Sequence, residues 1–160
     1  MHSIIKLGLA AAALALAVPA AAQTAPDMKI FTASAEVQAL IAKAKATIKP
    51  GEPTLSQPLL SLAPYKANLE YRVAKGPAAV HETEAELFYV IEGSGTVVTG
   101  GHLTGEKRTN EHNLSGDGIA DGQTRKVAKG DLFIVPQNTP HQVTQADGAL
   151  VVMTFHVPRS

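Results

Sequence analysis

The sequence contains no cysteine. No disulfide can therefore stabilise the fold, and no thiolate can bind a metal or carry a lipid. An excess of positive charge is also missing, because 14 Lys and Arg residues balance 14 Asp and Glu residues and lie scattered along the chain. Nucleic-acid binding needs a clustered positive surface, so no nucleic-acid partner is expected.

A hydrophobic run long enough to span a membrane is absent too, since a spanning helix needs roughly 20 apolar residues. The run at residues 7–18 is shorter, which disfavours a membrane anchor. It follows Lys6 and precedes small residues at 20–22, the pattern of a cleaved secretory signal. We therefore expect residues 1–22 to be removed. The mature chain, residues 23–160, is expected to be periplasmic or secreted, free of the membrane, and long enough for one domain.

The first element of the mature chain is predicted to be an amphipathic helix over residues 34–48. Its apolar residues recur at helical spacing: Val37, Leu40, Ile41 and Ala44. Ser34 is suited to cap the start of the helix, and Pro50-Gly51 is suited to end it. Residues 23–52 are thus expected to form an N-terminal extension with one helix.

Residues 53–160 have the pattern of an all-β barrel. Short strands separated by turn residues are typical of sandwiches and barrels. The predicted strands are 59–62, 67–73, 86–91, 95–99, 126–129, 132–135, 142–145 and 150–157. Strand 86–91 is apolar on both faces, so a second sheet or a partner subunit is expected to cover each face. Together with the apolar stripe of the helix, this strand predicts a homodimer.

The pattern of strands lapses between residues 100 and 125. This segment is polar and rich in glycine, with turn signals at Asp117-Gly118 and Asp121-Gly122. A loop of this length is unusual in a compact domain and is often functional. We expect a long polar loop, which acts either as a lid over a pocket or as a solvated hairpin with no part in binding.

Two segments carry the chemistry: HETEAELFYVIEGSG (81–95) and GDLFIVPQNTPH (130–141). They resemble the two signature motifs of the cupin family. Cupins are small jelly-roll barrels that usually hold a metal. The resemblance implies a cupin-type jelly-roll barrel in which His81, Glu86 and His141 bind the metal. If four residues separate the second histidine of the family's first motif from its glutamate, His81 is that histidine and Ala79 occupies the position of the first. If three residues separate them, Val80 and Glu82 occupy the two histidine positions instead. Asn138 replaces the second glycine of the second motif.

The residues themselves support such a site. Alternation along a strand puts Glu86 on the same face as Phe88 and Val90, which predicts that Glu86 points into the barrel. Pro136 ends the neighbouring strand, and His141 follows at a rigid strand end. Imidazole and carboxylate together suit a divalent ion of zinc, iron, manganese or nickel. The alternative is a metal-free pocket in which the histidines are merely hydrogen-bonded.

Other polar residues are compatible with more than one role. Glu84 is a candidate catalytic base, although it also fits a solvated turn, as does Glu82. His156 lies on the last strand, and the sequence does not reveal which face of that strand points inward. If the face with His156 points inward, His156 lines the cavity and can replace the missing ligand; if not, it has no part in the site. His102 and His112 are expected at the surface.

The predicted function is metal-dependent chemistry on a small polar molecule held in the barrel. Dioxygenases, isomerases and lyases all occur among the proteins that the chain resembles, so the reaction type stays open. The alternative is a non-enzymatic periplasmic module that binds a small ligand without metal.

Overall fold

The structure is a computed structural model that describes residues 28–159. The predicted signal segment, residues 1–22, lies outside the described residues. Helix α1 (Ser34–Thr47) is followed by the strands. These are β1 (Thr54–Leu62), β2 (Tyr65–Arg72), β3 (Ala78–His81), β4 (Glu84–Thr99), β5 (His102–Thr104), β6 (Lys107–Asn110), β7 (Asn113–Gly116), β8 (Gly118–Ala120), β9 (Gln123–Ala128), β10 (Leu132–Val135) and β11 (His141–Pro158).

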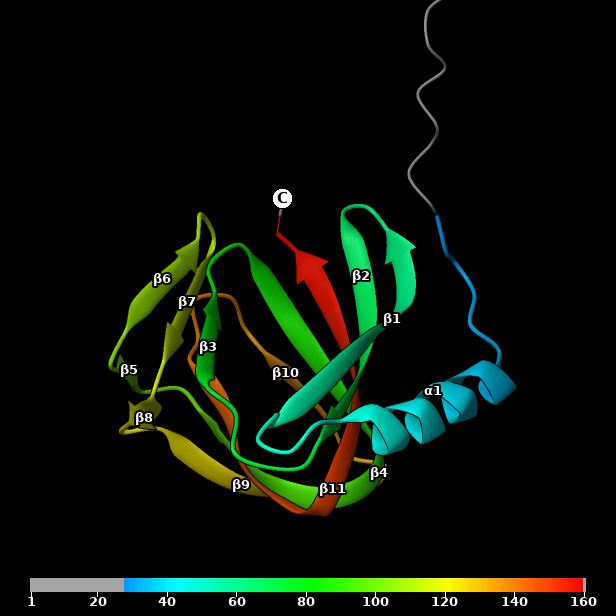
Figure 1. Cartoon of the computed structure of the whole chain (residues 1–160). Helices are drawn as coiled ribbons and strands as arrows, with labels where there is room; N and C mark the ends of the chain where they lie inside the picture. The colour runs from blue at the N-terminus through cyan, green and yellow to red at the C-terminus, as the bar shows by residue number, and fades with distance from the viewer. Residues whose placement is uncertain (1–27, 160) are drawn as a thin grey trace, which may run out of the picture.

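Two long antiparallel strands, β4 and β11, form the spine of the barrel (Figure 1). The later part of β11 pairs with β2 and with the first half of β4, which also pairs with β10. The first part of β11 pairs with β3 and with the second half of β4, which also pairs with β9. The same two strands thus run through both walls of an all-β jelly roll, as the sequence predicts.

The bend of β4 depends on Gly93. Its backbone has φ of 78°, a left-handed conformation that favours glycine. A Cβ at this position would also lie 1.9 Å from the carbonyl oxygen of Ala149, so no side chain fits. The two predicted strands 86–91 and 95–99 are therefore one continuous strand that bends at a glycine, where the sequence suggests a turn.

Apolar side chains pack in two layers, on the two faces of the same strands. The inner layer fills the barrel with Phe88, Val90, Val97, Val127, Val135, Val143, Leu150 and Val152. The outer layer lies between the sheet and α1, and includes Ile41, Ala44, Leu59, Leu69 and Tyr71. Val151 belongs to the outer layer and Val152 to the inner layer, so alternation along β11 directs even-numbered residues of this stretch inward.

The helix forms where the sequence predicts it, but with two differences. Ala33 occupies the cap position and no side chain caps the helix, so Ser34 is the first helical residue and not the cap. The apolar stripe of α1 packs on its own sheet, with Leu40 beside the outer core layer. The expectation that this stripe needs a partner subunit was therefore wrong, because β1 and β2 already cover it.

The expected loop at residues 100–125 is in fact built largely of short strands. Within it, β6 pairs with β7 and β5 pairs with β8, while β7 also pairs along the whole of β3. We call the β6–β7 unit, residues 107–116, the inserted hairpin. It lies on the side of the barrel away from α1 (Figure 1). The segment is thus part of a barrel wall.

Part of the outer surface of the barrel stays apolar and uncovered. Leu132 and Ile134 on β10 are 64% and 57% exposed, and Tyr89 on β4 is 39% exposed. Leu132 pairs directly with Tyr89, so these side chains form one face on adjacent strands. None of the helices between residues 28 and 159 has the length and apolar character needed to cross a bilayer.

Candidate metal centre

Three strands bring four side chains together inside the barrel. His81 ends β3, Glu86 lies near the start of β4, and His141 and His156 lie at the two ends of β11. Glu86 and His156 face each other as direct partners in the β4–β11 pair. Alternation along β11 turns His156 inward with Thr154 and Val152, which are also buried.

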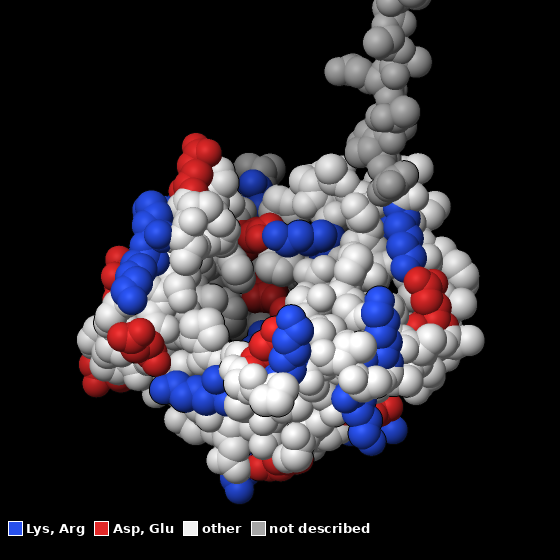
Figure 2. Space-filling view, viewed as in Figure 1, with Lys and Arg blue, Asp and Glu red and all other residues white. Residues whose placement is uncertain are grey.

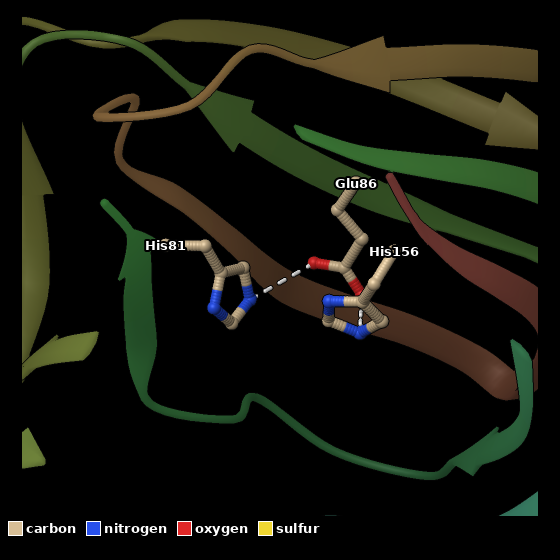
Figure 3. Close-up of side chains that lie close together, drawn as sticks. All are labelled: His81, Glu86 and His156. Atoms are coloured by element: carbon tan, nitrogen blue, oxygen red, sulfur yellow. Dashed lines mark ion pairs between the residues drawn. The ribbon is translucent and has the colours of Figure 1, made fainter. Parts of the chain in front are cut away.

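The three histidines converge on the carboxylate of Glu86. The Nε2 atoms of His81 and His141 lie 3.2 Å and 3.1 Å from Glu86 Oε2. His156 Nε2 lies 3.4 Å from the other carboxylate oxygen, Oε1. Figure 3 shows His81 directed at Glu86 from one side of the site and His156 beside Glu86 on the other side. The structure therefore brings together the three residues that the sequence predicts and adds His156.

The ring nitrogens that face away from Glu86 each meet an acceptor. His81 Nδ1 lies 2.5 Å from Asn113 Oδ1, and His156 Nδ1 lies 2.8 Å from Glu84 Oε1. His141 Nδ1 has a longer contact, 3.4 Å, with the carbonyl oxygen of Thr139. A proton on Nδ1 satisfies each of these acceptors. It leaves the lone pair of each neutral ring on Nε2, directed at the centre of the site.

That arrangement requires a positive charge between the rings and Glu86. A lone pair on Nε2 cannot donate to a carboxylate, so neutral histidines alone would face Glu86 without attraction. A metal ion or an added proton can supply the charge. Bonds of about 2.0–2.2 Å to nitrogen and oxygen place neighbouring ligand atoms roughly 3.0–3.5 Å apart around one ion. The donor set therefore fits a divalent metal. The ligand atoms of His81, Glu86 and His156 all lie within 4.8 Å of one another and form a group able to hold one ion, whereas His141 lies outside this group and reaches the site through its contact with Glu86.

The electrostatics agree with a site built for a cation. Glu86 is buried, with only 4% of its surface exposed. Burial acts to raise the pKa of Glu86, but in the metal-free protein hydrogen bonds from His141 and His81, donated when their Nε2 atoms carry a proton, outweigh it and hold the pKa well below its usual range. The carboxylate thus stays negative and ready to bind a cation.

Comparison with known proteins identifies the family. A sequence model of the cupins matches residues 54–158. The chain belongs to the cupin family. Among curated proteins, none is similar enough in sequence to count as a relative.

Solved structures share the cupin fold at low sequence identity. BH2720 from Bacillus halodurans is 15% identical with a TM-score of 0.53, over 82% of this chain and 83% of its own. A cupin superfamily protein from Desulfitobacterium hafniense is 12% identical with a TM-score of 0.51, over 84% and 100%. KdgF from Halomonas sp. is 19% identical with a TM-score of 0.50, over 70% and 87%. At these identities the likeness extends to the fold alone.

In this cupin, Glu84 holds a histidine. Its Oε1 lies 2.8 Å from His156 Nδ1 and 3.1 Å from Lys66 Nζ. Burial acts to raise the pKa of Glu84, but the hydrogen bond from Lys66 and the charge of His156 lower it. Through these contacts the carboxylate of Glu84 binds Nδ1 of His156, the ring nitrogen that faces away from Glu86. The contacts fit a residue that orients His156 better than the catalytic base expected from the sequence.

The remaining polar residues lie apart from the site. Glu82 forms a two-pronged ion pair with Arg108 at the rim, at 2.7 Å and 2.9 Å. His102 and His112 are exposed, as expected. Figure 2 shows this face of the molecule hollowed between its walls, with acidic and basic side chains around the hollow. One cavity inside the barrel is lined by His141 together with Ala79, Phe88, Phe133 and Arg72.

Proposed function

We propose that this cupin binds one divalent metal through His81, Glu86, His141 and His156. The observation that supports the proposal is the convergence of three Nε2 lone pairs on one buried carboxylate, at 3.1–3.4 Å. His156 supplies the third imidazole that Ala79 cannot supply. Zinc, iron, manganese and nickel all suit three imidazoles and one carboxylate.

We further propose that the site acts on a small polar molecule that enters the barrel. A bound divalent ion would act there as a Lewis acid or as an oxygen-binding centre. The chain's own residues hold the tautomers of the histidine rings and keep Glu86 ionised. Phe88 and Phe133 stack with their ring centroids 4.7 Å apart and exclude water on one side of the site. The cavity beside His141, of about 40 Å³, is where a molecule of only a few heavy atoms would lie. A non-enzymatic role in ligand capture is the second candidate, because His141, itself a proposed metal ligand, is the only general base among the described residues that line this cavity.

Elemental analysis and thermal unfolding test the proposal together. Purified protein is expected to carry one metal per chain, and chelation is expected to lower its melting temperature. Returning metal at one hundred times its dissociation constant should stabilise the fold by about 2.7 kcal/mol. A chain that binds neither zinc, iron(II), manganese nor nickel, with a melting temperature indifferent to all four, would contradict the proposal.

Two broader features belong to the same proposal. The signal-like segment at residues 1–22 supports export, and the mature protein is then expected to begin near Gln23. N-terminal sequencing of the protein from its native compartment checks this point. The apolar outer face formed by Tyr89, Leu132 and Ile134 supports a homodimer in which two copies cover each other's β10 and β4.

A further inference from the structure

We propose that the inserted hairpin is part of the metal centre, because Asn113 fixes the ring of His81. This inference rests on the proposed metal binding and extends the centre by a second layer of residues. No pattern in the sequence connects residues 107–116 with His81, which lies more than twenty-five positions earlier. The connection arises from the pairing of β3 with β7.

Strand β3 depends on the hairpin for most of its pairing. All four of its residues pair with β7, whereas β11 pairs with β3 at a single position, His141 with Ala79. His81 and Asn113 are direct partners in the β3–β7 register, so their side chains leave the backbone side by side. The hairpin thus places an amide next to the outer nitrogen of His81.

A chain of hydrogen bonds sets the orientation of that amide. The backbone N–H of His112 can only donate, and it donates to Asn110 Oδ1 at 3.0 Å. Asn110 Oδ1 also accepts from Asn113 Nδ2 at 2.8 Å. With its nitrogen engaged in this way, Asn113 turns its oxygen, Oδ1, to His81 Nδ1. A fixed backbone donor therefore determines which end of Asn113 meets the histidine.

The oxygen of Asn113 in turn selects the tautomer of His81. An amide oxygen accepts but cannot donate, so the proton of a neutral His81 ring must sit on Nδ1. The lone pair then lies on Nε2, the atom 3.2 Å from Glu86 Oε2. The hairpin thereby prepares His81 to bind a metal through Nε2 and holds the ring at one angle.

The backbone around His81 is held from both sides as well. The N–H of Glu82 donates to the carbonyl oxygen of His112 at 2.9 Å, and the N–H of Asn138 donates to the carbonyl oxygen of His81 at 2.8 Å. Arg108 adds its ion pair to Glu82, but half of the Arg108 side chain is exposed and such pairs contribute little energy. Asn113 is therefore the contact through which the hairpin acts on the ligand.

Substitution of Asn113 tests the inference, with cobalt(II) and zinc as probes. Asn113→Leu keeps the approximate size of the side chain but removes the acceptor. Loss of an outer hydrogen-bond partner of a ligand histidine typically costs about 10–100-fold in metal affinity. We expect a loss in that range and a changed visible spectrum of bound cobalt(II). Asn113→Asp, which retains an acceptor for His81 Nδ1, should restore the affinity.

Ser115→Ala provides the matched control. Ser115 lies on the same strand and donates to the carbonyl oxygen of Ala78 at 3.1 Å, so its loss weakens the hairpin without touching a histidine. This variant should bind metal like the wild type. Equal affinities and spectra for wild type and Asn113→Leu would overturn the inference while leaving the metal site intact. A wild type that binds no metal would instead overturn the proposed function, and this inference with it.

A second measurement uses the wild type and so does not require that Asn113→Leu folds. In the zinc-loaded wild type, ¹⁵N NMR of the imidazole of His81 reports which ring nitrogen carries the proton. We expect the proton on Nδ1 and the metal on Nε2. Metal on Nδ1 would exclude the hydrogen bond to Asn113 and overturn the inference.

Discussion

His156 and Glu86 are direct partners across the two longest strands of the barrel, and His156 Nε2 lies 3.4 Å from Glu86 Oε1. This pairing is the means by which the last strand joins a site whose other parts come from the two family motifs. Because the register of the two strands pairs position 156 of β11 with position 86 of β4, an inward residue at position 156 must lie next to Glu86. His156 occupies that position.

The first prediction concerns His156 itself. His156→Ala is expected to lower metal affinity by more than the roughly 10–100-fold that loss of an outer partner costs, because a ligand is removed. His112→Ala is the control, since His112 is exposed and lies outside the site. Isothermal titration with zinc measures both. An unchanged dissociation constant for His156→Ala would show that three ligands suffice and that His156 is only a neighbour.

His156 could not be assigned from the sequence for a simple physical reason. Strand β11 is apolar on both faces near its end, because one face fills the barrel and the other packs towards the helix and the outer surface. Alternation along β11 therefore does not show which of its faces points into the barrel. Glu86 could be assigned, since its strand also carries a recognisable motif that orients it.

The missed strands have a related cause. All four residues of β6 are exposed, so its sequence has no apolar face to reveal a strand. Strand β3 has only four residues, and two of them are alanines. Such strands form because partners in the sheet complete their hydrogen bonds, a tertiary effect that local pattern does not record. The contact between Asn113 and His81 was invisible for the same reason.

The second prediction separates the two roles of Glu84. If Glu84 orients His156, Glu84→Gln should weaken zinc binding, because a neutral amide oxygen is a weaker acceptor for His156 Nδ1 than the carboxylate; the loss should not exceed the roughly 10–100-fold that removal of an outer partner costs. If Glu84 serves only as a base in catalysis, metal affinity should stay unchanged. Glu82→Gln is the control, as Glu82 pairs with Arg108 at the rim. Competition against a chromophoric chelator gives the three dissociation constants.

The third prediction is that metal affinity falls as pH falls. Burial acts to lower the pKa of His81, but hydrogen bonds with Glu86 and Asn113 outweigh it and raise the pKa above 6.5. In the metal-free protein a proton therefore occupies the site first at His81, and metal must displace it. Burial, aided by Lys66, lowers the pKa of His156, so this ring competes with protons only at more acidic pH.

The expected profile has a defined sign. Affinity should be constant at pH values above the raised pKa of His81 and should decline below it, more steeply once His156 is also protonated. Glu86 contributes nothing to this decline, because its pKa lies well below the usual range. Zinc titrations in buffers of different ionisation enthalpy count the protons released. Affinity that rises on acidification, or zinc binding without proton release at pH values below the ordinary histidine pKa of 6.5, would contradict the proposed ligand set.

The last prediction concerns assembly. The outer face of β10 and β4 exposes Leu132, Ile134 and Tyr89, whereas α1 already covers the outer face of β1 and β2. Burying this face between two copies would remove apolar surface from water, at about 25 cal/mol per Å². We expect a dimer at micromolar concentration, and we expect Ile134→Lys to make it a monomer with its metal retained, because the site lies inside the barrel. Phe31→Lys, an equally drastic change at a residue 74% exposed elsewhere, should leave the dimer intact. Light scattering on the three proteins decides the matter: a monomeric wild type, or a dimer that survives Ile134→Lys, would show that this face is not the interface.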